Sequence, residues 1–461
     1  MSRSSVNIVG AGLCGSLLSI ILSRRGINAS VYERRSDPRS SETDAGRSIN
    51  LVLSARGIRG LKLAGAFEQV EPLLVPMKGR MIHHEDGSTE LQSYGQRKHE
   101  IIHSVSRAGL NRALIDTAID KYNVKVRFQQ EAVSYYPEES VLRIRDHEHD
   151  QDYDLKGKPL IAADGAGSVI RRAYNGNDRI APHEELLGHS YKELAIPPGP
   201  QGEFQLEPDA LHIWPRGEFM LIALPNPGGD FTLTLFMPNE GPSSFAAVKT
   251  EDEAEAFFAQ YFTDAAELIS DLTRSYVRNP VGILGTVRCG RWHDKDKVLL
   301  IGDAAHAVVP FHGQGMNLAF EDCVIIDQVL DNPKADWQTV FSVFQEEQIA
   351  NANAIADMAL ENYVEMRDTV RDPGYVVRKK LSFELERRLP NRFIPRYSMV
   401  MFHDEIPYAV AQARGEIQER LLRALTAKAR SIKEIDLDFA ESEAEKQLPP
   451  LHMKSPAEAG L

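Results

Sequence analysis

The segment Gly10-Ala11-Gly12-Leu13-Cys14-Gly15 constrains the fold of this 461-residue chain more than any other feature. It follows an apolar run at residues 6–9 and opens a segment, residues 17–22, whose apolar side chains recur at helical spacing. A second short apolar run ends in Glu33, 18 residues beyond Gly15. This pattern predicts a βαβ unit, whose two strands are parallel neighbours because the crossover is right-handed.

The glycines of this turn indicate a bound nucleotide. They permit a tight turn, close approach of the backbone to a pyrophosphate, and close packing of the helix on the strand. The helix N-terminus offers free N–H groups to phosphate, and Glu33 is placed to accept from ribose hydroxyls. Because a carboxylate there disfavours a 2′-phosphate, we expect FAD or NAD rather than NADP. A glycine-rich turn without a ligand is the alternative, which the joint occurrence of strand, helix and acid disfavours.

Two later segments resemble strand ends of the same sheet: residues 160–165, which end in Asp164-Gly165, and residues 298–303, which end in Gly302-Asp303. Ligands bind at the carboxyl ends of strands in open α/β sheets, so both aspartates are candidates to contact a ribityl chain or a ribose. For each aspartate the alternative is a helix N-cap.

A further glycine-rich stretch, Gly313-Gln314-Gly315-Met316-Asn317, precedes a predicted helix. This helix start is a candidate to place N–H groups and a helix dipole against the polar edge of a ring. An ordinary loop-to-helix cap is the alternative.

The fold class predicted from these patterns is α/β, with a Rossmann-like FAD-binding domain, an inserted antiparallel β-sheet substrate domain and a helical C-terminal region. Strand-like runs at residues 212–214, 219–224 and 231–236, and a hairpin around Asp86-Gly87, support the inserted sheet. We place the discontinuous FAD-binding domain at residues 1–75, 100–180 and 285–335, the substrate domain at 76–99 and 181–284, and the helical region at 336–461.

The composition limits the possible partners. The net charge of −13 argues against nucleic acid as the main partner. The three cysteines are too far apart in sequence for paired metal-ligand motifs, and they indicate a reducing compartment. Because no signal segment and no run of about 18 apolar residues occurs, we expect a soluble cytoplasmic protein with no transmembrane segment and no metal site.

Taken together, the motif containing Gly10, Gly12 and Gly15 with Glu33, the Asp164-Gly165 pair and the stretch from Gly302 to His306 resemble the single-component FAD-dependent aromatic hydroxylases, whose prototype is p-hydroxybenzoate hydroxylase. Five further segments resemble the kynurenine 3-monooxygenase branch of this family: residues 46–51, 211–215, 310–317, 361–366 and 392–397.

The resemblance implies a reaction. NADPH would reduce the flavin, O₂ would add to the reduced flavin at C4a, and the hydroperoxide would deliver one oxygen to the ring of L-kynurenine, giving 3-hydroxy-L-kynurenine. The cofactor carries the hard step, so we assign no catalytic acid or base. The alternatives are hydroxylation of another aromatic acid by an enzyme of the same family, and a non-oxygenating FAD-dependent oxidoreductase.

The glycine motif and the resemblance together predict the residues that contact FAD. They are Gly10, Gly12, Leu13, Gly15, Glu33, Arg34, Arg47, Arg107, Asp164, Gly165, Asp303, Gly313, Gln314, Gly315, Met316 and Asn317. The resemblance also implies that the carboxylate of the amino acid is held by Arg80, Tyr94, Asn362 and Tyr397. The ring pocket would be lined by Leu211, Ile222, Phe236, Phe311, His312 and Met366.

The residues alone support these substrate contacts less strongly. Arg80 suits a carboxylate by its bidentate fork, but a symmetric turn places it opposite residue 93 or 94, and one residue of register decides whether it shares a face with Tyr94. A solvated strand arginine is the alternative. Asn362 and Met366 share a helix face, although core packing explains Met366 equally well.

The remaining candidates have ordinary structural explanations. Phe236 would be a core residue by default. For His306 and His312 we find no acidic residue at a spacing that makes a convincing dyad, so we expect structural roles in their loops.

Overall fold

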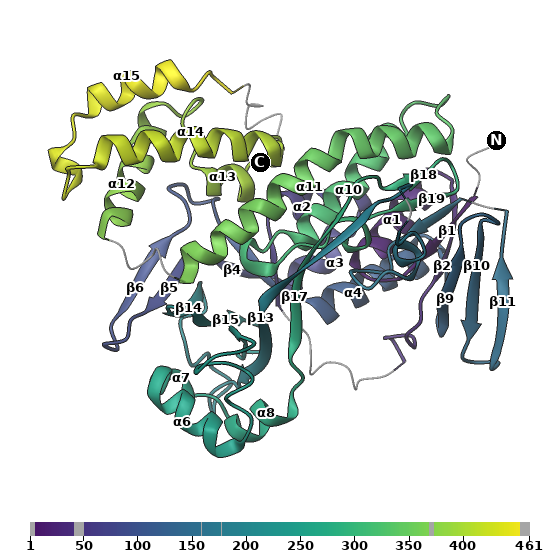
Figure 1. Cartoon of the computed structure of the whole chain (residues 1–461), viewed down its shortest axis with the longest axis horizontal. Coiled ribbons are helices and arrows are strands. Elements are labelled where there is room, and N and C mark those ends of the chain that lie inside the picture. Colours follow the sequence, from purple (N-terminus) through teal and green to yellow (C-terminus); the bar gives the residue numbers. More distant parts are fainter. Residues whose placement is uncertain (1–4, 41–49, 158, 177, 368–372, 452–461) are drawn as a thin grey trace.

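The computed structural model describes residues 5–40, 50–157, 159–176, 178–367 and 373–451. One part of the molecule is built on a six-stranded sheet with the order β18-β19-β12-β1-β2-β8 (Figure 1). Its strands are β1 (Ser5–Val9), β2 (Asn28–Tyr32), β8 (Lys125–Arg127), β12 (Leu160–Ala162), β18 (His293–Asp294) and β19 (Val298–Leu300). All neighbouring strands are parallel except β18 and β19, so segments far apart in sequence meet as the strand-end motifs predicted.

Helix α1 (Leu13–Arg24) follows the glycine-rich turn directly and covers this sheet. Its apolar residues from Leu17 to Leu22 are almost fully buried, as are Val6 and Ile8 of β1. Parallel strands are buried on both faces, which explains why these segments are apolar runs without polar alternation. The helix also packs against α2 (Ala55–Ala64), α4 (Arg107–Asp116) and α10 (Gly315–Val329).

A seven-stranded sheet with the order β17-β13-β16-β15-β14-β5-β6 forms the next part of the molecule. Its strands are β5 (Gly79–His83), β6 (Thr89–Ser93), β13 (Pro182–Ile196), β14 (Ala210–Arg216), β15 (Phe219–Pro225), β16 (Phe231–Pro238) and β17 (Gly282–Cys289). Neighbours are antiparallel apart from β14 and β5, which run parallel.

The two faces of this sheet serve different purposes. On one face Trp214, Phe231 and Leu233 pack against α6 (Glu251–Tyr261), α7 (Thr263–Ala266) and α8 (Leu272–Arg278), which lie together in Figure 1. On the other face Leu211 and Phe236 belong to the main core that is shared with the six-stranded sheet. The strict alternation of the strands therefore leaves one face free to form the wall of a site.

Two three-stranded sheets and several short helices complete this half of the molecule. The strands are β3 (Asn50–Leu53), β4 (Val75–Met77), β7 (Ile102–Ser106), β9 (Gln130–Tyr136), β10 (Val141–Asp146) and β11 (Gln151–Leu155). The short helices are α3 (Phe67–Val70), η1 (Glu71–Leu73), η2 (Thr117–Lys121), α5 (Val169–Arg172), α9 (Asp303–His306) and η3 (Pro310–His312).

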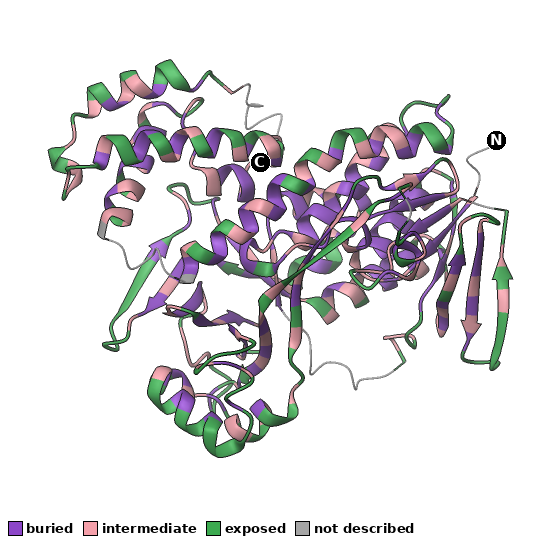
Figure 2. Ribbon diagram, viewed as in Figure 1, coloured by how far each residue is buried: buried purple, intermediate pink, exposed green. Residues whose placement is uncertain are grey.

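The C-terminal part is helical, as predicted. It contains α11 (Trp337–Arg367), α12 (Pro373–Arg388), α13 (Arg396–Met401), α14 (Tyr408–Thr426), η5 (Ile432–Glu434) and α15 (Leu437–Gln447). The last helices share a small core around Leu381 and Phe393, while α11 and α13 join the main core, which is the continuous buried region in Figure 2. Among the described helices, none is both long and apolar enough to cross a membrane.

Candidate active site

A cavity of about 670 Å³ lies between the carboxyl ends of β1, β12 and β19 and the face of the seven-stranded sheet that carries Leu211 and Phe236. Most of the predicted site residues line it: Gly10, Gly12, Leu13, Glu33, Arg34, Arg80, Tyr94, Arg107, Asp164, Gly165, Leu211, Ile222, Phe236, Asp303, Phe311, His312, Gly313, Gly315, Met316, Met366 and Tyr397. Gly15, Gln314, Asn317 and Asn362 lie beside it without lining it. Arg47 lies outside the described residues.

The three glycines of the N-terminal turn have different tasks. Gly10 has φ +96°, and a Cβ on it would overlap the Ala163 carbonyl oxygen. A Cβ on Gly15 would overlap the Gly10 carbonyl oxygen, so this glycine permits helix and strand to pack closely. Gly12 lines the cavity, and no described atom lies within 4 Å of a Cβ placed on it. The space beside Gly12 therefore fits a pyrophosphate that approaches the N-terminus of α1.

Glu33 closes this end of the cavity as a charged carboxylate. Its Oε2 accepts a hydrogen bond of 2.8 Å from the Ala11 amide, and its Oε1 accepts from the amide and the Nε of Arg35. Burial acts to raise the pKa of Glu33, but the Arg35 guanidinium and these backbone N–H groups outweigh it and lower the pKa. A charged carboxylate held in this way can accept a hydrogen bond from a ribose hydroxyl.

Asp164 is not the N-cap of α5, because that position is held by Ser168. The Oδ2 of Asp164 accepts from the amide of Val169, the first residue of this helix, at 2.9 Å. Its Oδ1 is buried and has no hydrogen-bond partner among the described residues. Burial raises the pKa of this carboxyl. Because a buried polar atom without a partner is costly, this oxygen fits a ligand hydroxyl at the cavity wall.

The start of α10 presents backbone, not amide side chains, to the cavity. Gly313, Gly315 and Met316 line it. Gln314 instead donates to the Met401 sulfur and accepts from the Tyr408 hydroxyl, and Asn317 donates to the carbonyl oxygens of Val52 and Gly313. The side chains of Gln314 and Asn317 thus hold the surrounding chain in place, and any contact they make with a cofactor runs through their backbone.

At the other end of the cavity Arg80 lies beside two stacked tyrosine rings. The expected pairing of Arg80 with residue 93 or 94 is wrong, because Arg80 pairs with Gln92. The His84 amide donates to the Ser88 carbonyl oxygen, so the hairpin turn is centred on Asp86 and not between Asp86 and Gly87. Residues 92 and 94 point to the same side, so Arg80 and Tyr94 still share a face. The Arg80 Cζ lies 5.8 Å from the ring centre of Tyr94 and 5.0 Å from that of Tyr397.

The charge and the free hydrogen-bonding groups of this cluster fit an anion. The Arg80 side chain is buried, and its nearest carboxylate oxygen, on Glu365, is 3.9 Å away. The Nε of Arg80 and the hydroxyl of Tyr94 are buried without a hydrogen-bond partner in the described structure. Burial acts to lower the pKa of Arg80, yet Tyr397, Tyr94 and Glu365 raise it, and burial raises the pKa of Tyr397 to about 12. A charged guanidinium and protonated phenols therefore face the same space.

Between the two ends the cavity is apolar. Leu211, Ile222 and Phe236 come from the seven-stranded sheet, and the ring of Phe311 lies 4.9 Å from that of Phe236. Asn362 does not line the cavity; its Nδ2 donates to the Phe311 carbonyl oxygen at 2.5 Å, so it fixes the position of Phe311.

Further lining residues were not predicted from the sequence: Met220, Leu224, Thr234, Tyr191 and Met401 among them. Alternation with Ile222 along β15 is the signal that would have found Met220 and Leu224.

The spacing along the sequence revealed no acidic partner for His306, but the structure provides one. Its Nε2 lies 2.7 Å from Oδ2 of Asp322, and both side chains are buried. The two residues are sixteen positions apart along the chain. They meet because α9 and α10 lie side by side in the folded protein. Among the described residues His312 has no acidic partner. It stacks on Tyr397 with ring centres 5.6 Å apart, and burial lowers its pKa to about 3, so it is a neutral ring in the cavity wall.

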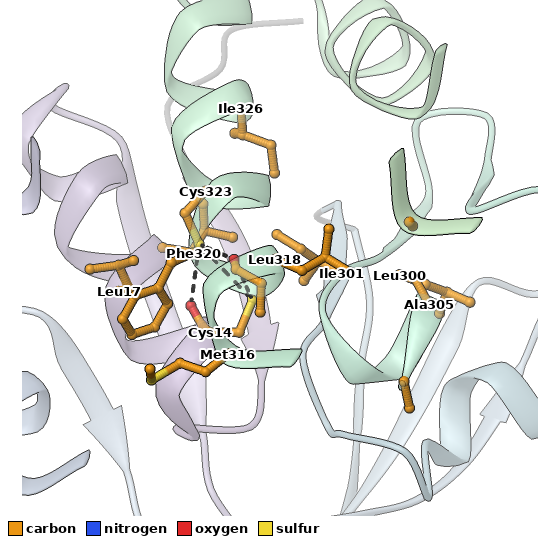
Figure 3. Packing of buried hydrophobic residues seen from close by; sticks show 14 of the residues in the cluster. Cys14, Leu17, Leu300, Ile301, Ala305, Met316, Leu318, Phe320, Cys323 and Ile326 are labelled. Atoms are coloured by element: carbon orange, nitrogen blue, oxygen red, sulfur yellow. Dashed lines mark hydrogen bonds between the residues drawn. The ribbon is translucent and has the colours of Figure 1, made fainter. Parts of the chain in front are cut away.

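Two of the cysteines also meet unexpectedly. The sulfur atoms of Cys14, in α1, and Cys323, in α10, are 4.0 Å apart, and Figure 3 shows them beside Phe320 and Met316. Both thiols are free and buried. The hydrogen bond with Cys323 and burial raise the pKa of Cys14, so the residue packs as an uncharged side chain.

Comparison with known proteins gives the family. A model of the FAD binding domain matches residues 3–186 and 284–332. A kynurenine 3-monooxygenase of Stenotrophomonas maltophilia (strain K279a) is 46% identical over 447 residues, which cover 97% of this chain and 98% of that protein. One of Xanthomonas axonopodis pv. citri (strain 306) is 46% identical over 451 residues, 98% of each chain. The chain belongs to the kynurenine 3-monooxygenase family.

Solved structures show that this member of the kynurenine 3-monooxygenase family has the fold of flavin-dependent hydroxylases. The tetrameric form of 2-methyl-3-hydroxypyridine-5-carboxylic acid oxygenase superposes with a TM-score of 0.65 at 18% identity, covering 80% of this chain and 94% of that one. Klebsiella pneumoniae HpxO, solved with FAD and uric acid, gives 0.59 at 17% identity, with 79% and 89% covered. The predicted family, fold class and FAD cofactor are confirmed.

Proposed function

We propose that this protein hydroxylates the ring of L-kynurenine to 3-hydroxy-L-kynurenine, with bound FAD, NADPH and O₂. The observation that carries the proposal is the buried Arg80, which lies beside the stacked rings of Tyr94 and Tyr397 at the far end of a cavity that begins at the FAD-binding turn. Its Nε and the Tyr94 hydroxyl have no hydrogen-bond partner among the described residues. The names of the 46% identical relatives support the same reaction.

Bound FAD would supply the redox chemistry and the activation of oxygen. The residues on this chain would bind and orient it. The N–H groups at the start of α1 would hold the pyrophosphate, and Glu33 would accept from the ribose. The unpartnered Oδ1 of Asp164 and the Asp303 side chain would accept hydrogen bonds from hydroxyls of the ribityl chain or a ribose. The N-terminus of α10 would direct its positive dipole end at the flavin ring.

The substrate would lie across the apolar part of the cavity. Arg80 would bind the carboxylate in a bidentate pair, and the Tyr94 hydroxyl would donate a further hydrogen bond. The Glu365 carboxylate lies 3.9 Å from the Arg80 guanidinium, just outside the cavity lining, and adds a negative charge to this end of the site. These neighbouring opposite charges suit an α-amino acid better than a simple aromatic acid.

The walls of the ring pocket would keep water out of the reaction. Phe311 stacks on Tyr363 with ring centres 3.9 Å apart, and Phe236 lies against it. From the C-terminal helices Met366, Tyr397 and Met401 complete the wall. Such a wall holds the ring next to the flavin edge and limits loss of activated oxygen to solvent.

Two measurements test the proposal. NADPH oxidation by the purified protein should rise on addition of L-kynurenine, and the product formed under ¹⁸O₂ should carry one labelled oxygen. Product without the label would show a non-oxygenating oxidoreductase. The analogue of kynurenine that lacks the α-amino group should be a much poorer substrate; equal kcat/KM for both would show that the enzyme acts on a different class of aromatic acid.

A further inference from the structure

The pair formed by His306 and Asp322 lies behind the wall of the cavity, outside its lining. Asp322 is in the middle of α10, and His306 is the last residue of the one-turn helix α9. Their side chains are 5% and 0% exposed. Burying a carboxylate is costly unless it is paired and hydrogen-bonded, so this arrangement has a specific task in the structure.

The Asp322 carboxylate binds both ends of the short helix that carries Asp303. Its Oδ2 accepts from the Gly302 amide at 3.0 Å and lies 2.7 Å from the His306 Nε2. Between them, the amides of Ala305 and His306 donate to the Gly302 carbonyl oxygen. Asp303 lies inside this closed turn and lines the cavity, so the carboxylate of Asp322 determines where Asp303 is presented.

Gly302 makes this turn possible and also tightens it. Its φ is +59°, in the region that favours glycine. A Cβ at this position would lie 3.1 Å from the Cys14 sulfur and 3.4 Å from the Cβ of Ala319. The start of the turn thus packs closely against α1 and α10. In this position the Gly302 amide donates to Asp322.

Asp322 is itself held from the opposite side. The Nε2 of Gln348, a fully buried residue of α11, donates to its Oδ1 at 3.0 Å. Burial acts to lower the pKa of His306, but the charge and hydrogen bond of Asp322 outweigh this and raise it. The turn, α10 and α11 therefore share one buried polar junction, and charge-assisted hydrogen bonds of this kind are the stronger ones.

We propose that His306 and Asp322 are positioning residues for FAD, which act through Asp303. Helix α10 carries Asp322 and also presents Gly315 and Met316 to the cavity at its N-terminus. The pair consequently fixes Asp303 and the start of α10 relative to each other, two segments that contact different parts of the cofactor. This inference rests on the FAD contacts assigned under the proposed function.

A double-mutant cycle tests it without any measurement of activity. Full-length apoprotein is titrated with FAD for the wild type, Asp303→Ala, His306→Phe and the double variant, and the flavin fluorescence gives Kd. Loss of a hydrogen bond to a charged group predicts that His306→Phe raises Kd by about 10-fold or more. In the Asp303→Ala background the same change should raise Kd by less than about 3-fold, because the two residues act through one contact.

Matched variants separate positioning from general loss of stability. His306→Gln keeps a side-chain N–H donor and should bind FAD within about 3-fold of the wild type, since the hydrogen bond is retained. His83→Phe removes another buried histidine, whose Nδ1 is 3.0 Å from Asp264 Oδ2 away from the cavity lining, and should leave Kd unchanged. If His306→Phe does not fold, Asp322→Asn takes its place in the cycle, with the same expected loss.

Wild-type affinity in His306→Phe, failure of His306→Gln to restore binding, or additive losses in the cycle would each overturn the inference. Wild-type affinity in Asp303→Ala would instead show that Asp303 does not touch FAD. In that case the assigned contact between Asp303 and FAD is wrong, and the positioning role that depends on it is wrong as well. Weak binding by Asp303→Ala together with normal binding by His306→Phe overturns the positioning role alone.

Discussion

The Arg80 guanidinium carbon lies 5.0 Å from the centre of the Tyr397 ring, so that β5 of the seven-stranded sheet and α13 of the C-terminal helices meet at one point of the cavity. Tyr94 stacks on Tyr397 from the same side, with ring centres 5.4 Å apart and planes at 11°. The cation therefore lies against a pair of aromatic rings. Its Nε and the Tyr94 hydroxyl have no partner among the described residues, and both side chains line the part of the cavity where the substrate carboxylate is proposed to bind.

Arg80→Ala should raise KM for L-kynurenine by about 30-fold or more, because a charge-assisted bidentate pair is lost. The FAD content, read from the visible spectrum of the purified protein, should stay the same. Arg143→Ala is a suitable control, since Arg143 is an exposed arginine that pairs with Asp154 on the β10–β11 hairpin. An unchanged KM in Arg80→Ala would contradict the carboxylate assignment.

Gly12→Ala and Gly15→Ala should fail in different ways. A Cβ on Gly12 meets no described atom within 4 Å, so Gly12→Ala should fold with nearly unchanged Tm but bind FAD at least about 10-fold more weakly, because the methyl group occupies the space of the pyrophosphate. Gly15→Ala overlaps the Gly10 carbonyl oxygen and should lower Tm strongly. Thermal melts of the apoproteins and FAD titration measure both effects, and equal behaviour of the two variants would disprove this division of tasks.

Asn362→Ala should reduce kcat/KM for L-kynurenine by about 10-fold, because the Phe311 carbonyl oxygen loses its buried donor and the aromatic wall shifts. The fraction of NADPH oxidation that yields product should fall as well, which product analysis against NADPH consumption measures. Asn353→Ala, on the exposed side of the same helix, is the matched control and should behave as the wild type. Full coupling in Asn362→Ala would show that Phe311 does not depend on this contact.

Acid should weaken the seven-stranded sheet through His212. Its Nδ1 lies 2.8 Å from the His83 Nε2 and its Nε2 donates to the Glu207 carbonyl oxygen, and burial lowers its pKa to about 4. Between pH 6.5 and 4 the unfolded chain therefore binds a proton here that the folded chain does not, and the free energy of unfolding falls as the pH is lowered. The contribution is on the order of 3 kcal/mol.

Urea unfolding at pH 7 and pH 4.5 checks this. In His212→Gln the difference in the free energy of unfolding between the two pH values should be smaller by about 2–3 kcal/mol than in the wild type. Equal differences in the two proteins would show that His212 does not titrate in this range.

The parts of the fold that depend on local patterns were predictable from the sequence. Strand ends marked by Asp164 and Asp303 join the glycine-rich turn in one parallel sheet, because each motif lies at the carboxyl end of its strand. The parallel pairing of β14 with β5 was not predictable, since alternation reveals the faces of a strand but not its neighbour. The division of the chain into three parts stays a prediction, and β17 runs across one of its proposed boundaries.

The parts of the site that depend on packing between distant segments were not predictable. His306 meets Asp322, and Cys14 meets Cys323, only once α10 has packed against α1 and α9. The register of Arg80 was decided by a turn centred on Asp86, which composition does not distinguish from a symmetric two-residue turn. The individual contacts with FAD and substrate stay predictions that the variants above are designed to test.

The order of strands in the six-stranded sheet also determines when this protein can fold. The central β1 is flanked by β2, made at once, and by β12, which in turn needs β19 as its neighbour, and α10 then covers α1. During synthesis the edge of β1 therefore stays unpaired until β12 has left the ribosome, and β12 lacks its other neighbour until β19 follows. Such non-local pairing is slow and exposes aggregation-prone intermediates. We therefore expect the nascent chain to depend on chaperones until α10 has emerged.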